Sequence, residues 1–412
     1  MKHLRYIAFA SLCLFAAVSC REKKVTGAAS IPFVEEILSD TTSRNYSLVS
    51  SYDSDYHGGT ISITGAPEDV MLLAEAFITA DMSDNIDGKK GGDMLPDFAG
   101  EVIAPVLDVA NAPYEDYFTL GNDAFLKEVA VRNFLFALDT VSLISPFDPA
   151  HIARKVKAKT IILASSLQAV SGQAEIDTLC RVANPGVEVI SALDAMMADA
   201  AACKGSSVLW TTRERRDLAV FDKYFERHPA YRCPVYSPAI DSLRDEGSVG
   251  GRLLDMLDDM AASGKTLRIG AIVLDDNELS PSELQEAIDM VRDTDDDYLL
   301  VYKNMLAPDC KCISAGESVT RLCYRRMRER NSFTHRIAYP SLKCYVTTPA
   351  ASLPDTVCDL DGSMTYSFRY YRESGSSGET YSFVELRDRY ISEALLEKMK
   401  DIAPKTYSLY VR

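Results

Sequence analysis

Short apolar segments, each about the length of one strand, recur between stretches of helical periodicity from residue 97 to residue 348. The clearest of them lie at 160–164, 187–191, 207–211, 267–274 and 298–302. Continuous apolar runs of this length are typical of parallel strands that are buried on both faces and connected by helices. The pattern therefore predicts an α/β fold built on parallel sheets.

The segments on either side of this region follow a different pattern. Before it, residues 59–64 alternate like a strand, Pro67 opens a helix to about Phe77, and residues 81–97 have the composition of a loop. After it come two segments that predict a hairpin around a glycine- and serine-rich turn, then a helix and a last strand: 364–371, 379–384, 391–402 and 406–411. We expect the two flanking segments, 31–96 and 349–412, to form an appended α+β element.

The first twenty residues have the pattern of an export signal. A basic start precedes an apolar stretch, residues 6–18, that is too short for an ordinary membrane-spanning helix. Residues 17–20 (Ala-Val-Ser-Cys) resemble the lipobox of bacterial lipoproteins. That resemblance implies cleavage before Cys20, a lipid on Cys20 and attachment to the cell envelope; the outer membrane is expected because no aspartate follows. Residues 21–30 then predict a flexible tether. An ordinary secreted protein is the alternative.

Composition excludes some classes of function. The formal net charge of −16 argues against nucleic-acid binding, which needs a basic face, and 47% hydrophobic residues indicate a globular chain. Eight cysteines follow Cys20; they allow 105 full pairings, so the sequence leaves any disulfides open. Cys310 and Cys312 have no second cysteine pair, and the histidines are scattered, so we expect no metal and no cofactor.

Polar residues stand at the ends of several predicted strands. Ser165 and Ser166 follow the first, Thr211 ends the third, and Asp276 and Asn277 follow the fourth. Open α/β sheets bind ligands outside the carboxyl ends of their strands, so these positions are candidates for a small-molecule site.

The order of elements from 97 to 348 resembles the aspartate/glutamate racemase superfamily, and glutamate racemase most of all. Five segments of this chain match motifs of the family in the family's order, and the family's own version of each motif is given in parentheses. They are 162–167 (Ala-Cys-Asn-Thr), 187–195 with 207–211 (strand, helix, Gly-x-x-x-Thr), 236–238 through 245–247 (Cys-Pro-Leu…Glu-Glu-Gly), 274–281 (Leu-Gly-Cys-Thr-His-Tyr-Pro-Leu) and 313–319 (Asp-Ser-Ala-Glu). The resemblance implies two α/β domains, 97–192 with 311–348 and 193–310, and an active site between them.

The chain departs from the family at its catalytic positions. Racemisation needs two thiols on opposite faces of the substrate, one to remove and one to return a proton. Here the two cysteine positions are Ser165 and Asp276, and the histidine of the second motif is Glu278. The family's Asp-Ser-Gly start is matched at best from Asp97, and its Pro-Tyr-Gly loop has no match after residues 120–122. We expect no amino-acid racemase activity.

Three hypotheses follow. The first is a lipid-anchored protein that binds a small molecule in the cleft between the domains, through Asp97, Ser165, Ser166, Thr211, Asp276, Asn277 and Glu278. The second is an enzyme of altered chemistry, such as an isomerase, lyase or hydrolase, that uses Ser165 and Asp276. The third is a structural or assembly lipoprotein with a closed cleft; no protein partner is indicated. Because the matched motifs bring acids and no lysine or arginine to the cleft, a bound molecule is expected to be neutral or cationic.

Overall fold

The computed structural model describes residues 31–53, 57–85, 88–238, 248–263, 268–336, 338–375 and 380–411. The chain divides into two compact units, 1–30 and 31–412, and the fold below is that of the second. The export signal, Cys20 and the tether lie outside the described residues. Within the described residues, no helix has the length and apolar character needed to span a membrane.

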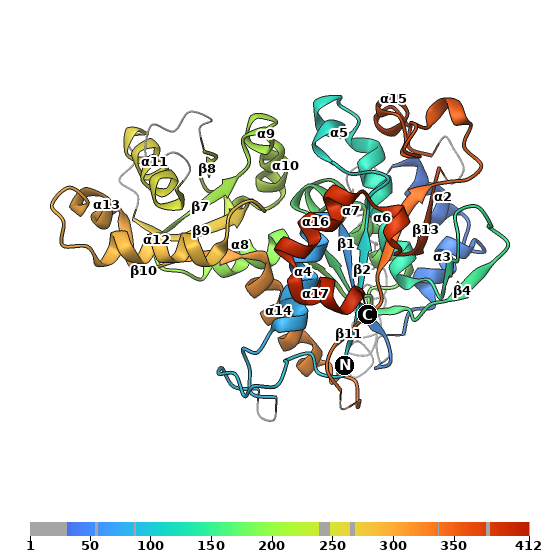
Figure 1. Ribbon diagram of the computed structural model, residues 1–412, viewed down its shortest axis with the longest axis horizontal. Coiled ribbons are helices and arrows are strands. Elements are labelled where there is room, and N and C mark those ends of the chain that lie inside the picture. Colours follow the sequence, from blue (N-terminus) through green and yellow to red (C-terminus); the bar gives the residue numbers. More distant parts are fainter. Residues whose placement is uncertain are drawn as a thin grey trace, which may run out of the picture. The chain divides into compact units, whose positions relative to one another are not determined.

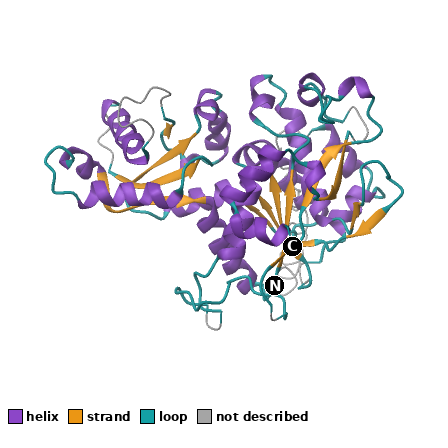
Figure 2. Cartoon of the chain, viewed as in Figure 1, coloured by secondary structure: helices purple, strands orange, loops and turns teal. Residues whose placement is uncertain are grey.

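A large, mostly parallel sheet forms the first part of this unit (Figures 1 and 2). Its strands run in the order β4-β3-β13-β12-β2-β1-β5-β6, and a short strand, β11, also pairs with β2. Their bounds are β1 Thr60–Gly65, β2 Val102–Leu107, β3 Val141–Leu143, β4 Ile152–Arg154, β5 Ala158–Leu163, β6 Val189–Ser191, β11 Ser341–Leu342, β12 Tyr345–Pro349 and β13 Tyr381–Glu385.

Helices cover both faces of the large sheet, so its central strands are buried along their whole length. β1 and β5 are buried at every position. One face packs against α4 (Pro67–Thr79), α14 (Ala315–Glu329), α16 (Glu393–Ile402) and α17 (Pro404–Tyr410). The other packs against α6 (Asp123–Leu138) and α7 (Ser166–Ala183), with α2 (Pro32–Ser39) and α3 (Arg44–Ser50) outside them.

A second sheet has four strands, all parallel, in the order β10-β9-β7-β8. They are β7 Ser206–Thr211, β8 Val235–Tyr236, β9 Ile269–Asp275 and β10 Leu306–Ser314. One face packs against α11 (Val249–Ala262), α12 (Pro281–Asp293) and α13 (Leu300–Met305). The opposite face packs with α8 (Ala192–Ala201) and α10 (Val220–Arg227) into a core that also contains residues of α6 and α7, so apolar packing joins the two sheets.

The remaining described helices are short. α5 (Glu115–Thr119), α9 (Arg213–Asp217) and α15 (Tyr366–Tyr370) each make one or two turns, and single 3₁₀ turns lie at Pro229–Tyr231, Asp355–Val357 and Asp388–Tyr390. Of these, α5 and α9 contribute to the candidate site, because they follow strands β2 and β7 at the carboxyl ends of the two sheets.

The predicted α/β fold with parallel sheets is confirmed, and the strands expected at 59–64, 160–164, 187–191, 207–211 and 267–274 all form. The expectation that residues 31–96 are an appended extension is wrong. β1 lies in the middle of the large sheet, paired with β2 on one side and β5 on the other. The tail is also part of that sheet, because β13 pairs with β12 and β3. These strands belong to the large sheet because they pair with strands far away in the chain, and such pairing cannot be predicted from the local sequence pattern.

Three local predictions are also wrong. Residues 298–302 were expected to form a strand, but α13 begins at Leu300 and β10 follows it; Tyr298 and Val301 are exposed, unlike residues of a buried strand. Residues 364–371 contain helix α15, capped by Thr365, in place of one arm of a hairpin. Residues 406–411 lie largely in α17, which Pro404 starts. Short apolar segments do not distinguish a helix from a strand by their period alone.

Candidate functional site at the strand ends

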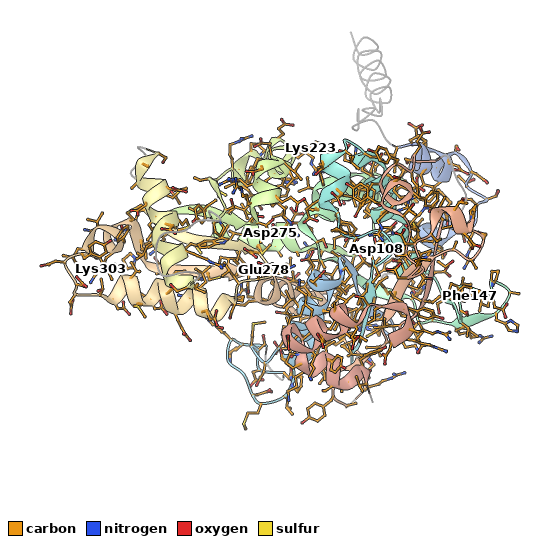
Figure 3. The ribbon with its side chains drawn as sticks, turned by 45° about the horizontal axis from the view of Figure 1, so that its top comes forward. Asp108, Phe147, Lys223, Asp275, Glu278 and Lys303 are labelled. Carbon is orange, nitrogen blue, oxygen red and sulfur yellow. The ribbon has the colours of Figure 1, made fainter. Side chains whose placement is uncertain are left out.

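The carboxyl ends of strands from both sheets meet in a network of buried polar side chains. Asp69, in the first turn of α4, accepts hydrogen bonds from the Ser165 hydroxyl and the Asn277 side-chain amide. Ser165 follows β5 of the large sheet, and Asn277 follows β9 of the small sheet. One carboxylate therefore links the two sheets through its two oxygens. Figure 3 shows Asp275 and Glu278, at the end of β9, toward the large sheet.

Ser165 lies where β5 passes into α7, and its side chain is 1% exposed. Besides donating to Asp69, its hydroxyl oxygen accepts the Ala66 N–H at 2.8 Å. This contact needs the glycine at position 65, because a Cβ there would lie 2.7 Å from the Ser165 Oγ and the backbone has a φ of +150°. The end of β1 thus holds the Ser165 hydroxyl in a fixed place.

Asp69 is buried, and burial raises the pKa of its carboxyl above the ordinary value. The positive charge of Arg215 and the hydrogen bonds from Asn277 and Ser165 act in the opposite direction. The pKa of Asp69 is raised overall because loss of hydration outweighs these three contacts.

Arg215, on α9, supplies a buried positive charge to the same region. Its Nε donates to Glu115 at 2.9 Å, and one terminal nitrogen donates to Asp275 Oδ2 at 3.0 Å and to the Ser166 hydroxyl at 3.4 Å. Asp275 Oδ2 also accepts the Thr211 hydroxyl at 2.9 Å. Burial lowers the pKa of Arg215, but the carboxylates around it raise the pKa by more, so the guanidinium stays charged.

Gln168 is the one member of this region whose side chain lacks partners among the described residues. It lies in the first turn of α7, is fully buried, and neither its amide oxygen nor its amide nitrogen makes a hydrogen bond. Its oxygen faces the end of β1, since a Cβ on Gly65 would lie 3.3 Å from it. A buried amide without a partner is costly, and such groups in folded proteins usually meet a water or a ligand.

The structure brings together four of the seven candidate ligand-binding residues: Ser165, Ser166, Thr211 and Asn277. Asp276 does not contact Ser165; its carboxylate accepts the backbone N–H of Glu278 at 2.9 Å, and the Glu278 side chain is exposed. The pairing of Ser165 with Asp276 is therefore a wrong expectation, because Asp69 occupies the position beside Ser165.

Asp97 lies elsewhere and is not part of the site. It precedes β2, at the amino end of the large sheet, and its two oxygens accept the backbone N–H groups of Met82 and Ser83 at 3.0 Å. The carboxyl ends of the strands are at the opposite edge of the same parallel sheet. Asp97 therefore stabilises a loop, and the alignment of residues 97–100 with the family's Asp-Ser-Gly turn was wrong.

Sequence reasoning missed Asp69, Glu115, Arg215 and Gln168. A usable signal existed for Arg215, which follows the strand end at Thr211 by four residues, and for Asp69, which lies two residues after the helix-starting Pro67. The expectation that the site contains acids without a lysine or arginine is also wrong, because Arg215 pairs with Asp275 and Glu115.

A second buried polar cluster follows β2. Asp108 is fully buried and accepts hydrogen bonds from Asn111, Tyr114, Asn133 and Thr347, at distances of 2.6, 2.7, 3.2 and 2.8 Å. Residues 113–114, a Pro-Tyr dipeptide, lie in the loop between β2 and α5, a few positions after Asp108. Residues 120–122, after which the sequence shows no match to the family's Pro-Tyr-Gly loop, lie between α5 and α6.

The cysteines lie outside this network. All eight after Cys20 are free thiols in the structure, and Cys310 and Cys312 lie in β10. Burial raises the pKa of the thiols at positions 180, 233, 310, 312 and 344 to about 12, so they are not thiolates near neutral pH. Across the described ranges, no group of three or more histidine, cysteine, aspartate or glutamate side chains could hold a metal ion.

Solved structures similar to this chain include a glutamate racemase from Francisella tularensis in complex with D-glutamate (14% identity, 77% of this chain and 95% of that chain covered, TM-score 0.43). Others are glutamate racemase isoform RacE1 from Bacillus anthracis (13%, 71% and 89%, 0.41) and an aspartate racemase homologue from Pyrococcus horikoshii (14%, 66% and 97%, 0.34). Neither a protein-family model nor a curated protein matches the sequence. At these identities and TM-scores, the likeness carries no conclusion about ligand or activity.

Proposed function

We propose that this chain is a lipid-anchored binding protein of the bacterial cell envelope that does not racemise amino acids. The proposed ligand is a small neutral or cationic molecule that binds where the strand ends of the two sheets meet. The observation that carries the proposal is the buried, unpaired amide of Gln168 beside Ser165 and Gly65.

The absence of racemisation follows from the groups at the two proton-transfer positions. The hydroxyl of Ser165 is too weak an acid to be ionised near neutral pH, so it cannot act as a base without activation. The carboxylate of Asp276 accepts a hydrogen bond from the backbone N–H of Glu278. The thiols of the described residues lie outside the network and are protonated. Two-base proton exchange at a substrate carbon has no thiol pair to perform it here.

The charge of the network supports a neutral or cationic ligand. Three carboxylates, Asp69, Asp275 and Glu115, surround one guanidinium, that of Arg215. A ligand carboxylate would add a further negative charge in a buried region, where repulsion between like charges is strong. A neutral group with one donor and one acceptor would satisfy the Gln168 amide without that penalty.

Calorimetric titration of the mature chain tests this with three probes: glutaramide, putrescine and glutamate. We expect glutaramide or putrescine to bind and glutamate not to bind. Gln168→Leu should weaken the binding at least tenfold, whereas Gln173→Leu should not, because Gln173 lies on the same helix but contacts Asp194. Tight glutamate binding, no binding of any probe, or equal effects of the two variants would contradict the proposal.

The lipid anchor is tested separately. Cys20→Ala should move the protein from the membrane fraction to the soluble fraction or leave it unprocessed, because the proposed attachment depends on the lipid at that residue. Incorporation of a radiolabelled fatty acid into the wild-type chain, and not into the variant, measures the modification directly. A variant that stays in the membrane fraction and still takes up label would exclude Cys20 as the anchor.

The contact between Ser165 and Asp69 favours one alternative, a hydrolase in which Asp69 accepts the proton of the Ser165 hydroxyl. A raised pKa makes an ionised Asp69 a stronger base than an ordinary carboxylate. A fluorophosphonate probe distinguishes the two functions: covalent labelling that disappears in Ser165→Ala would support the hydrolase and contradict a purely binding role.

A further inference from the structure

The hairpin at the edge of the large sheet exposes an unusual amount of apolar surface. β3 and β4 pair antiparallel; Ile144 and Phe147 lie between them, Ile152 starts β4 and Val156 follows it, and their exposed fractions are 41%, 78%, 56% and 46%. Figure 3 shows Phe147 projecting at the far end of this hairpin. Single exposed apolar residues are ordinary, but a cluster on one projecting element marks a contact surface.

The apolar surface continues behind the hairpin into a groove of about 380 Å³. The hairpin contributes Leu143, Pro146, Pro149 and Ile152 to it, and the sheet and helix α6 contribute Phe383 and Phe136. These two rings stack with their centres 4.2 Å apart. Arg44, Arg132 and Asp139 also line the groove, so the exposed hairpin and the groove together form one partly apolar surface, the hairpin surface, on a chain that is strongly acidic.

The charges near the hairpin surface are basic. Between Ile144 and Lys159 the chain has one acidic residue, Asp148, which pairs with His151 at 2.5 Å, and four basic residues. Of the four, Lys155 and Lys159 are buried and Lys157 is half-buried, so Arg154 is the exposed one. In a chain of net charge −16, this exposed guanidinium on the hairpin is complementary to anionic headgroups.

The start of the folded unit lies beside the base of the hairpin. Arg44 on α3 pairs with Asp139, which precedes β3, at 2.6 Å, and Figure 1 shows α2 and α3 near β4. Cys20 precedes Ile31 by 11 residues. At no more than about 3.4 Å per residue, this tether keeps a lipid on Cys20 within ~40 Å of Ile31.

We propose that the hairpin surface docks on the lipid bilayer, with Phe147, Ile144 and Ile152 at the level of the headgroups and Arg154 facing anionic lipids. This extends the proposed lipid anchor, but it is independent of any ligand at the strand ends. A tethered domain that also touches the bilayer directly has a fixed orientation, and its hairpin holds the sheet edge at the membrane surface.

The test uses the mature chain as Cys20→Ser, made without lipid, so that only the folded unit can bind. Sedimentation with vesicles of phosphatidylethanolamine and phosphatidylglycerol should show binding that weakens when phosphatidylglycerol is replaced by phosphatidylcholine. The double variant Phe147→Ser/Ile152→Ser should lower the partition coefficient at least tenfold. The matched control Met290→Ser/Tyr298→Ser, which removes exposed apolar residues of the small-sheet region, should leave it unchanged.

Three outcomes would overturn the proposal: no vesicle binding by the Cys20→Ser chain, equal loss in the hairpin and control variants, or binding unaffected by the hairpin variant. A photo-crosslinking residue at position 147 of the full chain then identifies the partner in cells. Adducts with lipid are expected, and adducts with protein alone would also overturn it. Failure of the proposed lipid anchor can be distinguished from failure of the hairpin proposal. The wild-type chain would take up no fatty-acid label in the first case, whereas vesicle binding is measured on the Cys20→Ser chain without that label.

Discussion

Replacing Arg215 by methionine should destabilise the protein strongly, and more so at high pH. The substitution removes the positive charge that faces Asp275, Glu115 and Asp69 while keeping most of the side-chain volume. Removing one partner from a buried ion pair costs ~3–5 kcal/mol, because the remaining carboxylates are left uncompensated. The neighbouring Arg216→Met is the matched control, since its guanidinium is partly exposed and pairs with exposed Asp217, where such pairs contribute ~0–1 kcal/mol.

The pH dependence follows from Asp69. Its folded-state pKa is raised above the ordinary value of 3.8, so the stabilisation from its bound proton is complete at low pH and is lost as the pH rises through the folded pKa. Arg215 lowers the pKa of Asp69, so removing Arg215 should raise that pKa further. The loss of folding free energy with pH then continues to higher pH, and ionised Asp69 destabilises the folded state more. The difference between Arg215→Met and wild type should therefore be small near pH 4 and largest near pH 8.

Urea denaturation at both pH values measures this effect. Trp210 is the only tryptophan, it is fully buried, and it lies next to Thr211 at the end of β7, so its fluorescence reports on this region. The reasoning would be refuted if Arg215→Met and Arg216→Met had equal effects, or if the effect of Arg215→Met were the same at both pH values. Asp275→Asn added to Arg215→Met should recover part of the loss, because it removes one uncompensated charge.

Three further outcomes are expected. The purified mature chain should incorporate no solvent deuterium at the α-carbon of glutamate or aspartate by mass spectrometry; incorporation at a turnover rate would show that proton exchange survives without the thiols. Gly65→Ala should destabilise the fold by about 1–3 kcal/mol in urea denaturation, since its Cβ would lie 2.7 Å from the Ser165 Oγ, and an unchanged midpoint would contradict that geometry. Asp108→Ala should cost ~3 kcal/mol or more by leaving four buried donors without their acceptor, and a loss no greater than that of an exposed Asp361→Ala control would show that the cluster is not needed.

Long buried strands were predictable because each carries its own signal. β5 ends in the apolar residues 161–163, β9 is apolar from Ile269 to Leu274, and polar residues follow both strands. Their existence and the position of Ser165 and Asn277 at the strand ends could therefore be read from the sequence. Short segments of mixed character were not predictable. Residues 300–305 and 404–410 form helices because their tertiary contacts favour them, and an apolar segment of six or seven residues fits either structure.

The membership of the site was less predictable than its location. Asp69 and Arg215 lie 146 positions apart in the sequence, on helices that follow strands of different sheets. Nothing local to either residue indicates the other, and only the meeting of the two sheets brings them together. Asp97 was included in the site on the basis of a short motif fragment, but it lies at the amino edge of the large sheet. The strand whose carboxyl end reaches the site is β1, about 35 residues earlier in the chain.

The closed state of the network bears on how a ligand can enter. Ser165, Ser166, Thr211, Asp69 and Asp275 are all at most 9% exposed, and Asp69 is shared between Ser165 of one sheet and Asn277 of the other. We therefore expect a ligand that reaches Gln168 to part the contact between Asp69 and Asn277 first. The measured affinity then falls short of the intrinsic affinity by the fraction of molecules that are open. A weak measured affinity would thus be consistent with a well-matched site, whereas a fast and tight association would mean that the two sheets separate readily at this contact.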